Sequence, residues 1–307
     1  MAYARIVVVT KKTPYEELLV AHNTHGQAAF VLQSLGGDIN EYLTLHQKYY
    51  DAVRVVESVL PKTISHTLVE RQSLPSMLFR PDDLVIAVGP DGLFANLAKY
   101  LSGQPVVGVN PLPEVIDGVV MRFPPIALAI SNILSILLNG GGATEEIVLA
   151  EAKTSIGGRL LAVNDFLVGR LDHISARYVI ESNGVKERQS SSGILVATGL
   201  GSSGWMRSVK QAVSAGHDES PVLLPKDPAW DETRLIFAVR EPFPSRATQI
   251  GIVYGEITQD APLHIVSEMP EGGVVFSDGV PEDSLSLPAG TRLAIGVAPE
   301  KIKLVVP

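Results

Sequence analysis

The sequence contains no cysteine among its 307 residues. Disulfide bonds and thiolate metal sites are therefore excluded, because both require cysteine sulfur. A chain without disulfides is typical of the reducing cytoplasm. Met1–Val9 holds one Arg and a short apolar run, which is too little for a secretory signal peptide. These observations predict a cytoplasmic protein.

Positive charge is also scarce, because 25 Lys and Arg stand against 33 Asp and Glu and leave a net charge of −8. Such a chain has no basic field for the phosphates of nucleic acid, so we expect no nucleic-acid partner. The most apolar stretch, Ile126–Leu138, includes Ser131, Asn132 and Ser135. It is shorter than the ~20 residues that a membrane-spanning helix needs. We expect a buried helix there and no membrane partner.

The N-terminal half alternates apolar strand candidates with helical segments. Ile6–Val9 is a β-branched run typical of a strand buried on both faces. Helical spacing follows over Tyr15–Leu35 and ends at Gly36–Gly37. This alternation predicts an α/β domain with a doubly wound parallel sheet. Further strands are predicted at Val53–Val56, Leu84–Val88 and Val106–Val109, and further helices at Ala95–Leu101 and Ile126–Leu138.

After Gly140–Gly142 the apolar residues change to a period of two. Short strands separated by turn signals are typical of an antiparallel β-sandwich. One helical segment, Ser203–Val213, interrupts them. We expect two domains, residues 1–125 and 126–307, and the pattern leaves open whether a final strand at Lys301–Val306 returns to the first domain. The other predicted strands are Ile147–Ala150, Leu160–Val163, Tyr178–Glu181, Ile194–Ala197, Leu235–Val239, Gln249–Tyr254, Leu263–Val266 and Val274–Phe276.

The first segment with chemical meaning is Asp83–Gly92, a buried strand that runs into a glycine turn before a helix. Glycine has no Cβ, so backbone amides at Gly89 and Gly92 can approach phosphate oxygens. The start of the next helix adds a partial positive field, and this end of a strand is where doubly wound folds bind ligands. Pro-Asp-Gly is also a common tight turn. These residues alone leave a phosphate turn and a plain turn both open.

A Gly/Ser/Thr-rich loop, Thr198–Trp205, connects an apolar strand to a helix. Small residues with free amides can surround a ribose or a phosphate, and a helix start favours negative charge. The loop lacks Gly-Lys-Ser/Thr, so it is not a Walker A loop. Its composition favours contact with a nucleotide over an unliganded turn of the sandwich.

Asn164 and Asp165 follow another apolar strand. Their side chains can hydrogen-bond sugar hydroxyls or base edges, or they can cap a turn. Taken by themselves they favour the cap.

In chain order, these segments resemble the motif series of the NAD kinases, and the resemblance covers nearly the whole chain. It is closer to the mitochondrial-type enzymes of animals and their bacterial relatives, through Val7–Glu16, Ser191–Gly193 and Phe237–Pro242. The segments Gly89-Pro-Asp-Gly92, Gly108-Val-Asn110, Asn164-Asp165, Thr198–Trp205 and Asp278-Gly279 resemble the family's GGDG, GVN and NE motifs, its Gly/Ser/Thr loop and its DG motif.

The resemblance implies a Rossmann-like N-terminal domain, an all-β C-terminal domain and an active site between them. It implies transfer of the terminal phosphate of ATP to the 2′-hydroxyl of the adenosine ribose of NAD, with a divalent metal, usually Mg²⁺. It also implies a homo-oligomer, and we expect a homodimer.

The same resemblance implies roles for individual residues. Asp91 would be the general base or the orienting carboxylate for the acceptor hydroxyl, and Gly89 and Gly92 would form the phosphate turn. Asn164 and Asp165 would contact NAD. The remaining residues in matching motifs are Asn110, Thr198, Gly201, Ser202, Ser203, Trp205 and Asp278.

An acidic chain must bring its positive charge to the phosphates locally. Lys11 and Lys12 follow the first strand and are the candidates, with a solvated loop pair as the alternative.

Three residues depart from the family pattern. Pro90 replaces a glycine of the turn and removes an amide donor. Leu93 stands where the family usually has Thr, and Asp165 is one methylene shorter than the usual Glu. These changes keep two alternatives open: a non-catalytic NAD(H)-binding protein, and a kinase of the same superfamily that acts on a sugar or lipid.

Overall fold

The computed structural model describes residues 3–214 and 224–307, which divide into two compact units. The first unit runs through Glu145 and takes up the chain again at Ile302–Pro307, and the second is Glu146–Lys301. Both boundaries fall inside long strands, β5 (Thr144–Thr154) and β16 (Arg292–Val305). The end of the chain therefore belongs to the first unit.

The first unit is built on a parallel sheet with the strand order β2-β1-β3-β4, to which the last residues of β16 add a parallel edge. Its strands consist largely of β-branched and aliphatic residues, and all six residues of β3 are buried, as a sheet covered on both faces requires. The strands are β1 (Arg5–Thr10), β2 (Ser65–Glu70), β3 (Asp83–Val88) and β4 (Pro105–Val109).

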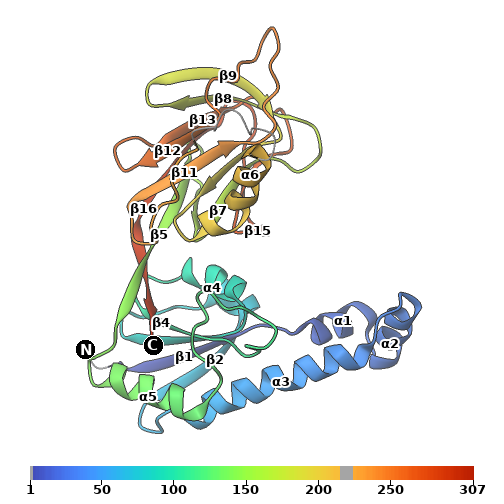
Figure 1. Cartoon of the computed structure of the whole chain (residues 1–307), viewed down its shortest axis with the longest axis vertical. Coiled ribbons are helices and arrows are strands. Elements are labelled where there is room, and N and C mark those ends of the chain that lie inside the picture. The colour runs from blue at the N-terminus through green and yellow to red at the C-terminus, as the bar shows by residue number, and fades with distance from the viewer. Residues whose placement is uncertain (1–2, 215–223) are drawn as a thin grey trace. The chain divides into compact units, whose positions relative to one another are not determined.

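Helices cover both faces of this sheet (Figure 1). α3 and α5 pack on one face, where Val53 and Val56 of α3 join Ile130 of α5 in a buried core. α4 covers the other face and buries Phe94 and Leu97. The α/β fold predicted for this half is confirmed. The helices are α1 (Pro14–His22), α2 (His25–Ser34), α3 (Ile39–Ser58), α4 (Asp91–Ala98) and α5 (Ala127–Leu138), with a 3-10 turn at Arg71–Ser76.

The domain boundary differs from the one predicted near residue 125. α5 buries Ile133, Leu134 and Leu137 against the parallel sheet, so it belongs to the first unit. The boundary consequently follows Glu145.

Two secondary-structure predictions in this half were wrong. Val53–Val56 is not a strand, because Val53 and Val56 lie on the buried stripe of the 20-residue helix α3. The single helix predicted over Tyr15–Leu35 is two helices. The chain breaks at Asn23, which has φ of 62°, and Thr24 starts α2 by accepting the amide of Gln27 at 3.2 Å.

The second unit is a β-sandwich, as predicted. One sheet has the antiparallel order β12-β11-β10-β7-β14-β15, and the other is built from β16-β13-β8-β9 with the β5–β6 hairpin. Side chains such as Phe166, Tyr178 and Phe237 fill the core between them. The strands are β6 (Arg159–Ala162), β7 (Asp165–Arg170), β8 (Ala176–Ser182), β9 (Val185–Ser191), β10 (Ile194–Ala197), β11 (Arg234–Val239), β12 (Tyr254–Thr258), β13 (Leu263–Ser267), β14 (Gly273–Ser277) and β15 (Val280–Ser286).

The helix α6 (Trp205–Ser214) follows a 3-10 turn at Gly201–Ser203 and covers the outer face of the first of these sheets. Met206 anchors it among buried residues of β10 and β11. The strand predicted at Gln249–Tyr254 was misplaced, because pairing with β11 begins only at Tyr254. No described helix is long and apolar enough to cross a membrane.

Candidate functional site

The turn predicted to hold phosphate lies between β3 and α4 in the first unit. The amide of Gly89 donates to Val109 O at 3.1 Å, which fixes the turn to the neighbouring strand β4. Pro90 is the N-cap of α4, with φ of −76° and no side-chain cap, and Asp91 is the first helical residue. A φ near −65° is the value to which proline is restricted, so Pro90 fits the turn without strain.

Both carboxylate oxygens of Asp91 accept backbone hydrogen bonds. Oδ2 accepts from Val119 N at 2.9 Å, and Oδ1 accepts from Val120 N at 3.0 Å and Met121 N at 3.2 Å. A carboxylate offers about four acceptor sites, so these three bonds leave one on Oδ2. Asp91 therefore ties the Val119–Met121 segment to the start of α4 and retains capacity for one more donor. No sequence motif marked this segment.

Gly108 explains why the segment can lie so close to the sheet. A Cβ on this glycine would lie 2.3 Å from Val120 O and 3.0 Å from Met121 Cα. The glycine of the GVN motif is thus required by backbone packing in this chain.

Asn110 also acts within its own loop. Its Nδ2 donates to Ile116 O at 2.6 Å, and its Oδ1 accepts from Leu112 N at 3.0 Å. The residue is only 5% exposed. A ligand contact by this side chain would have to displace these bonds.

Lys11 and Lys12 differ in their partners. Lys12 Nζ lies 3.3 Å from Gln72 Oε1 and 3.9 Å from Glu70, so its charge is partly neutralised. Among the described residues, the ammonium of Lys11 has no hydrogen-bond or ion-pair partner. Both lysines follow β1, and the carboxyl ends of parallel strands meet at one edge of a sheet. Lys11 is consequently the better candidate for a phosphate contact.

The hydroxyl of Tyr49, in α3, connects the ends of β1 and β3. It accepts from Lys11 N at 2.9 Å and donates to Val88 O at 2.9 Å. Burial raises the pKa of Tyr49, which keeps the hydroxyl protonated as a donor. The ends of β1 and β3 are therefore held at a fixed separation beside the turn.

In the second unit, Asp278 joins two of the predicted motifs. Its carboxylate accepts the backbone amides of Val163, Asn164 and Asp165, with the shortest bond 2.6 Å to Asn164 N. Asp278 adopts φ of 53°, a left-handed conformation that aspartate tolerates better than most residues. The DG motif therefore shapes the Asn164–Asp165 turn.

The Gly/Ser/Thr loop packs against the same turn. Thr198 N donates to Asn164 O at 2.9 Å, and the Thr198 hydroxyl donates to Val163 O at 2.6 Å. A Cβ on Gly201 would lie 2.0 Å from Asn164 O, so only glycine permits this approach. Three segments far apart in the sequence thus form one structure.

The loop's hydroxyl groups divide into two sets. Thr198 and Ser202 are buried and bond to the backbone, with Ser202 Oγ donating to Gly199 O at 2.7 Å. The Ser203 hydroxyl also donates to the backbone, to Leu200 O at 3.0 Å, but Ser203 and Trp205 are exposed and lie at the start of α6. The buried pair shapes the loop, whereas the exposed residues can meet a ligand.

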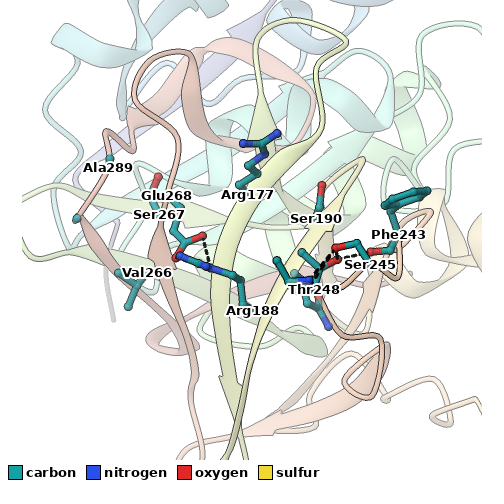
Figure 2. Close-up of a pocket in the computed structure, with 13 residues that line it drawn as sticks. Arg177, Arg188, Ser190, Phe243, Ser245, Thr248, Val266, Ser267, Glu268 and Ala289 are labelled. Carbon is teal, nitrogen blue, oxygen red and sulfur yellow. Dashed lines mark hydrogen bonds and ion pairs between the residues drawn. The ribbon is translucent and has the colours of Figure 1, made fainter.

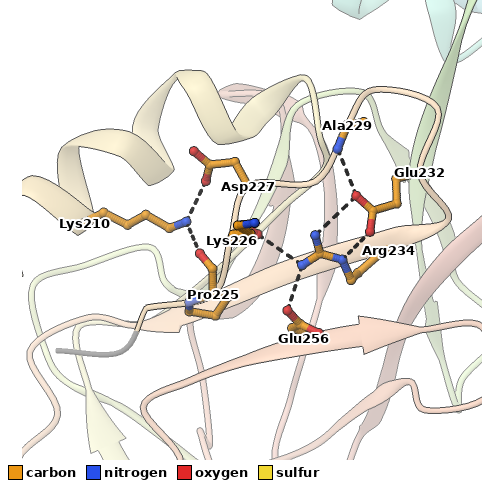
Figure 3. A network of polar contacts seen from close by, with 8 residues as sticks. All are labelled: Lys210, Pro225, Lys226, Asp227, Ala229, Glu232, Arg234 and Glu256. Atoms are coloured by element: carbon orange, nitrogen blue, oxygen red, sulfur yellow. Dashed lines mark hydrogen bonds and ion pairs between the residues drawn. The ribbon is translucent and has the colours of Figure 1, made fainter.

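The segment that precedes β11 packs over this loop and was missed by sequence reasoning. A Cβ on Gly199 would lie 2.2 Å from Ala229 O, so the two backbones are in contact. Arg234 fixes the segment by donating to Lys226 O at 3.1 Å and pairing with Glu232 at 2.6 Å. Figure 3 shows this network, whose members are Lys210, Pro225, Lys226, Asp227, Ala229, Glu232, Arg234 and Glu256.

Trp205 borders a cavity of about 440 Å³ between α6 and the β11–β12 edge. The guanidinium carbon of Arg240 lies 5.2 Å from the centre of its ring, a cation–π geometry. Glu241 adopts φ of 44° beside it, a strained conformation of the kind found at ligand sites. The side-chain amide of Asn164 has no hydrogen-bond partner among the described residues and stays available.

The described residues include no group of three or more His, Asp or Glu side chains arranged to hold a metal ion. Mg²⁺ in phosphoryl-transfer sites takes many of its ligands from substrate phosphates.

No protein-family model matches the sequence, and no curated protein matches it. Its fold is shared by solved structures. The crystal structure of an NAD kinase from Archaeoglobus fulgidus in complex with ATP is 15% identical, with a TM-score of 0.55 over 98% of this chain and 93% of that chain. The crystal structure of yeast NADH kinase complexed with NADH is 14% identical, with a TM-score of 0.58 over 100% of this chain and 84% of that chain. The chain therefore has the fold of the NAD and NADH kinases, as its motifs predicted.

Proposed function

We propose that this protein is an NAD kinase, which transfers the terminal phosphate of ATP to the 2′-hydroxyl of the adenosine ribose of NAD. One observation carries the proposal: the Asn164–Asp165 turn is hydrogen-bonded both to Asp278 and to Thr198, at the start of the Gly/Ser/Thr loop. Asn164 and Asp278 are 114 residues apart in the chain. The solved structures that share the fold were crystallised with ATP and with NADH, which supports a nucleotide donor and a dinucleotide acceptor.

The acceptor would bind to the second unit. The unpartnered amide of Asn164 can bond to ribose hydroxyls, and the carboxylate of Asp165 lies next to it on the same turn. Ser203 and the start of α6 would meet the negative charge of the dinucleotide, because the first amides of a helix favour anions. Thr198 and Ser202 hold this surface in shape before the substrate arrives.

Asp91 would orient the attacking hydroxyl. Its Oδ2 accepts one backbone bond and retains one acceptor site, so it can take the hydrogen bond of the 2′-hydroxyl. Phosphoryl transfer depends chiefly on positioning and on neutralising charge on the transferred group. Lys11 would supply local positive charge. Mg²⁺ bound to ATP would supply further neutralisation of phosphate charge.

A non-catalytic NAD(H)-binding protein is the second candidate. The turn favours it in one respect, because Pro90 supplies no amide to a phosphate and Leu93 is a buried apolar residue. Those features weaken the donor side of the site while the proposed acceptor side stays intact.

The test is an NADP-formation assay with ATP, Mg²⁺ and either NAD or NADH, combined with thermal unfolding in the presence of each dinucleotide. We expect NADP formation and a higher Tm with NAD, since a ligand that binds only the folded state stabilises it. The shift should shrink in Asn164→Ala. A Tm shift without NADP formation would select the second candidate, and no shift at millimolar dinucleotide would refute both.

We also propose a cytoplasmic homodimer, which the resemblance to NAD kinases and the cysteine-free composition support. β12 and β15 end one sheet of the sandwich and offer edges for pairing. Light scattering at tens of micromolar protein should give the mass of a dimer or larger, and a clean monomer would contradict the proposal.

A further inference from the structure

The second unit contains a cavity of about 800 Å³ that no nucleotide motif explains (Figure 2). Its walls come from β8, β9, the end of β13 and the loop that follows β11. None of the residues assigned above to ATP or NAD lines it. The volume falls within the roughly 300–1,000 Å³ of small-molecule sites.

The charge in this cavity is unbalanced. Its charged lining residues are Arg177, Arg188 and Glu268. Arg188 is neutralised, because its Nε and Nη2 both donate to Glu268, at 2.9 and 2.7 Å. The guanidinium of Arg177 has no polar partner among the residues that the structure describes. One positive charge is therefore left over in the cavity of a chain whose net charge is −8.

Ser190 places a hydroxyl beside this charge. Ser190 and Arg177 are cross-strand partners in the β8–β9 pair, so their side chains project from the same face of the sheet. The Ser190 carbonyl accepts the amide of Phe243 at 2.8 Å, whereas its hydroxyl makes no hydrogen bond to a described residue. A planar guanidinium and a hydroxyl are thus both available as donors.

The wall that adjoins β9 is fixed by hydrogen bonds. The loop that carries Phe243 is tied to β9 a second time, by Gln249 N donating to Arg188 O at 2.9 Å. Inside the loop, the hydroxyls of Ser245 and Thr248 bond at 2.7 Å, and Thr248 Oγ1 donates to Phe243 O at 2.7 Å. Phe243 is left 63% exposed at the rim. The cavity therefore combines the guanidinium of Arg177 with an aromatic ring in its lining.

We propose that this cavity binds a small organic anion: a carboxylate or phosphate group on a compact apolar body. Arg177 binds the anionic group through its fork of N–H donors, which matches both oxyanions, and Ser190 donates a further hydrogen bond. Phe243 packs against the body. The ligand neutralises the unbalanced charge, and its binding is independent of the kinase reaction.

The test is isothermal titration calorimetry of the full chain with phenyl phosphate, benzoate and inorganic phosphate. We expect phenyl phosphate or benzoate to bind at one site per chain, and more tightly than inorganic phosphate. Arg177→Ala should weaken that binding at least 10-fold, and Phe243→Ala should remove the advantage of the aromatic probes. Arg177 is exposed, so its variant should keep the wild-type Tm.

Arg246→Ala is the matched control. Arg246 is an exposed arginine in the loop that carries Phe243, and its side chain does not line the cavity. The affinity of Arg246→Ala for the aromatic probes should stay within about 2-fold of wild type, since salt screens the interaction between distant exposed charges. Asn164→Ala should also bind the probes normally, which separates this cavity from the nucleotide site. Equal losses in Arg177→Ala and Arg246→Ala, an unchanged affinity in Arg177→Ala, or no binding of any probe at millimolar concentration would overturn the proposal.

Discussion

Replacing Asp91 by Asn tests the tethering bonds that the structure shows for this carboxylate and the orienting role that we propose for it. An amide keeps one acceptor oxygen. If that oxygen takes the place of Oδ1, the bonds from Val120 and Met121 survive, but the new NH₂ group faces the Val119 amide across the 2.9 Å of the former Oδ2 bond. Asp91→Asn therefore loses at least one charge-assisted bond and the acceptor site offered to the ribose hydroxyl.

The lost bond sets the expected change in stability. A hydrogen bond to a charged group contributes roughly 1.5–3 kcal/mol, and we take the lower end because Val119 is exposed. About 1.5 kcal/mol in a unit of this size corresponds to a fall in Tm of about 3–6 °C. If Asp91 also orients the acceptor, kcat should fall ~10²-fold or more while NAD affinity stays within a few-fold.

Differential scanning calorimetry and NADP formation measure the two effects, with kcat taken well below both melting temperatures so that unfolding does not contribute. Asp117→Asn is the control. It makes the same change in the loop that contains the Val119–Met121 segment, at an exposed carboxylate that has no hydrogen bond among the described residues. An unchanged Tm in Asp91→Asn would refute the tethering of the Val119–Met121 segment. An unchanged kcat would remove Asp91 from the mechanism.

Three further changes test the packing of the Gly/Ser/Thr loop, a buried ion pair and a titrating carboxylate. Gly201→Ala should lower Tm and abolish stabilisation by NAD, since its Cβ would lie 2.0 Å from Asn164 O. Gly169→Ala is the control and should change Tm much less, because its Cβ would have no contact closer than 3.8 Å. Asp83→Asn should lower the free energy of unfolding in urea by about 3 kcal/mol, because it breaks a buried ion pair with Arg5. Asp82→Asn, at an exposed carboxylate, should leave that free energy unchanged. Equal losses in the two variants would refute the ion-pair argument. Burial raises the pKa of Glu16, but bonds from the Thr13 amide and the Tyr50 hydroxyl outweigh it and lower the pKa below 4.5. This stabilisation is complete above that value and is lost as pH falls through the lowered pKa, so urea midpoints between pH 6 and 3 should fall more for wild type than for Glu16→Gln; parallel curves would contradict it.

The elements that the sequence predicted best are those whose burial is uniform. Leu84–Val88 and Val106–Val109 are continuous apolar runs, and both lie in buried strands of the parallel sheet. Val53–Val56 is also rich in valine but includes Arg54, and its buried neighbours Tyr49 and Ala52 continue a helical stripe. The edge strand Ser65–Glu70 was missed because four of its six residues are exposed and carry no apolar pattern.

The candidate site was predictable only in part, for a related reason. Composition identifies Thr198 and Asn110 as polar residues in the matching motifs, but it cannot tell whether a side chain faces a ligand or its own backbone. In the structure both side chains donate to backbone carbonyls, Asn110 to Ile116 O and Thr198 to Val163 O. The Val119–Met121 segment contacts Asp91 across 28 to 30 positions of sequence. Non-local contacts of this kind leave no local pattern to detect.

The two departures in the phosphate turn belong together in the structure. Leu93 is 1% exposed, and a Cβ on Gly89 would lie 2.8 Å from its Cδ2. Gly89 is therefore required by the packing of Leu93, whether or not a phosphate approaches it. Pro90 fits the same turn because its φ of −76° is the one that proline favours. Because Pro90 has no amide hydrogen, the phosphate contact that we propose would rely on other groups. One is Lys11, which follows the neighbouring strand β1 and whose ammonium has no partner among the described residues.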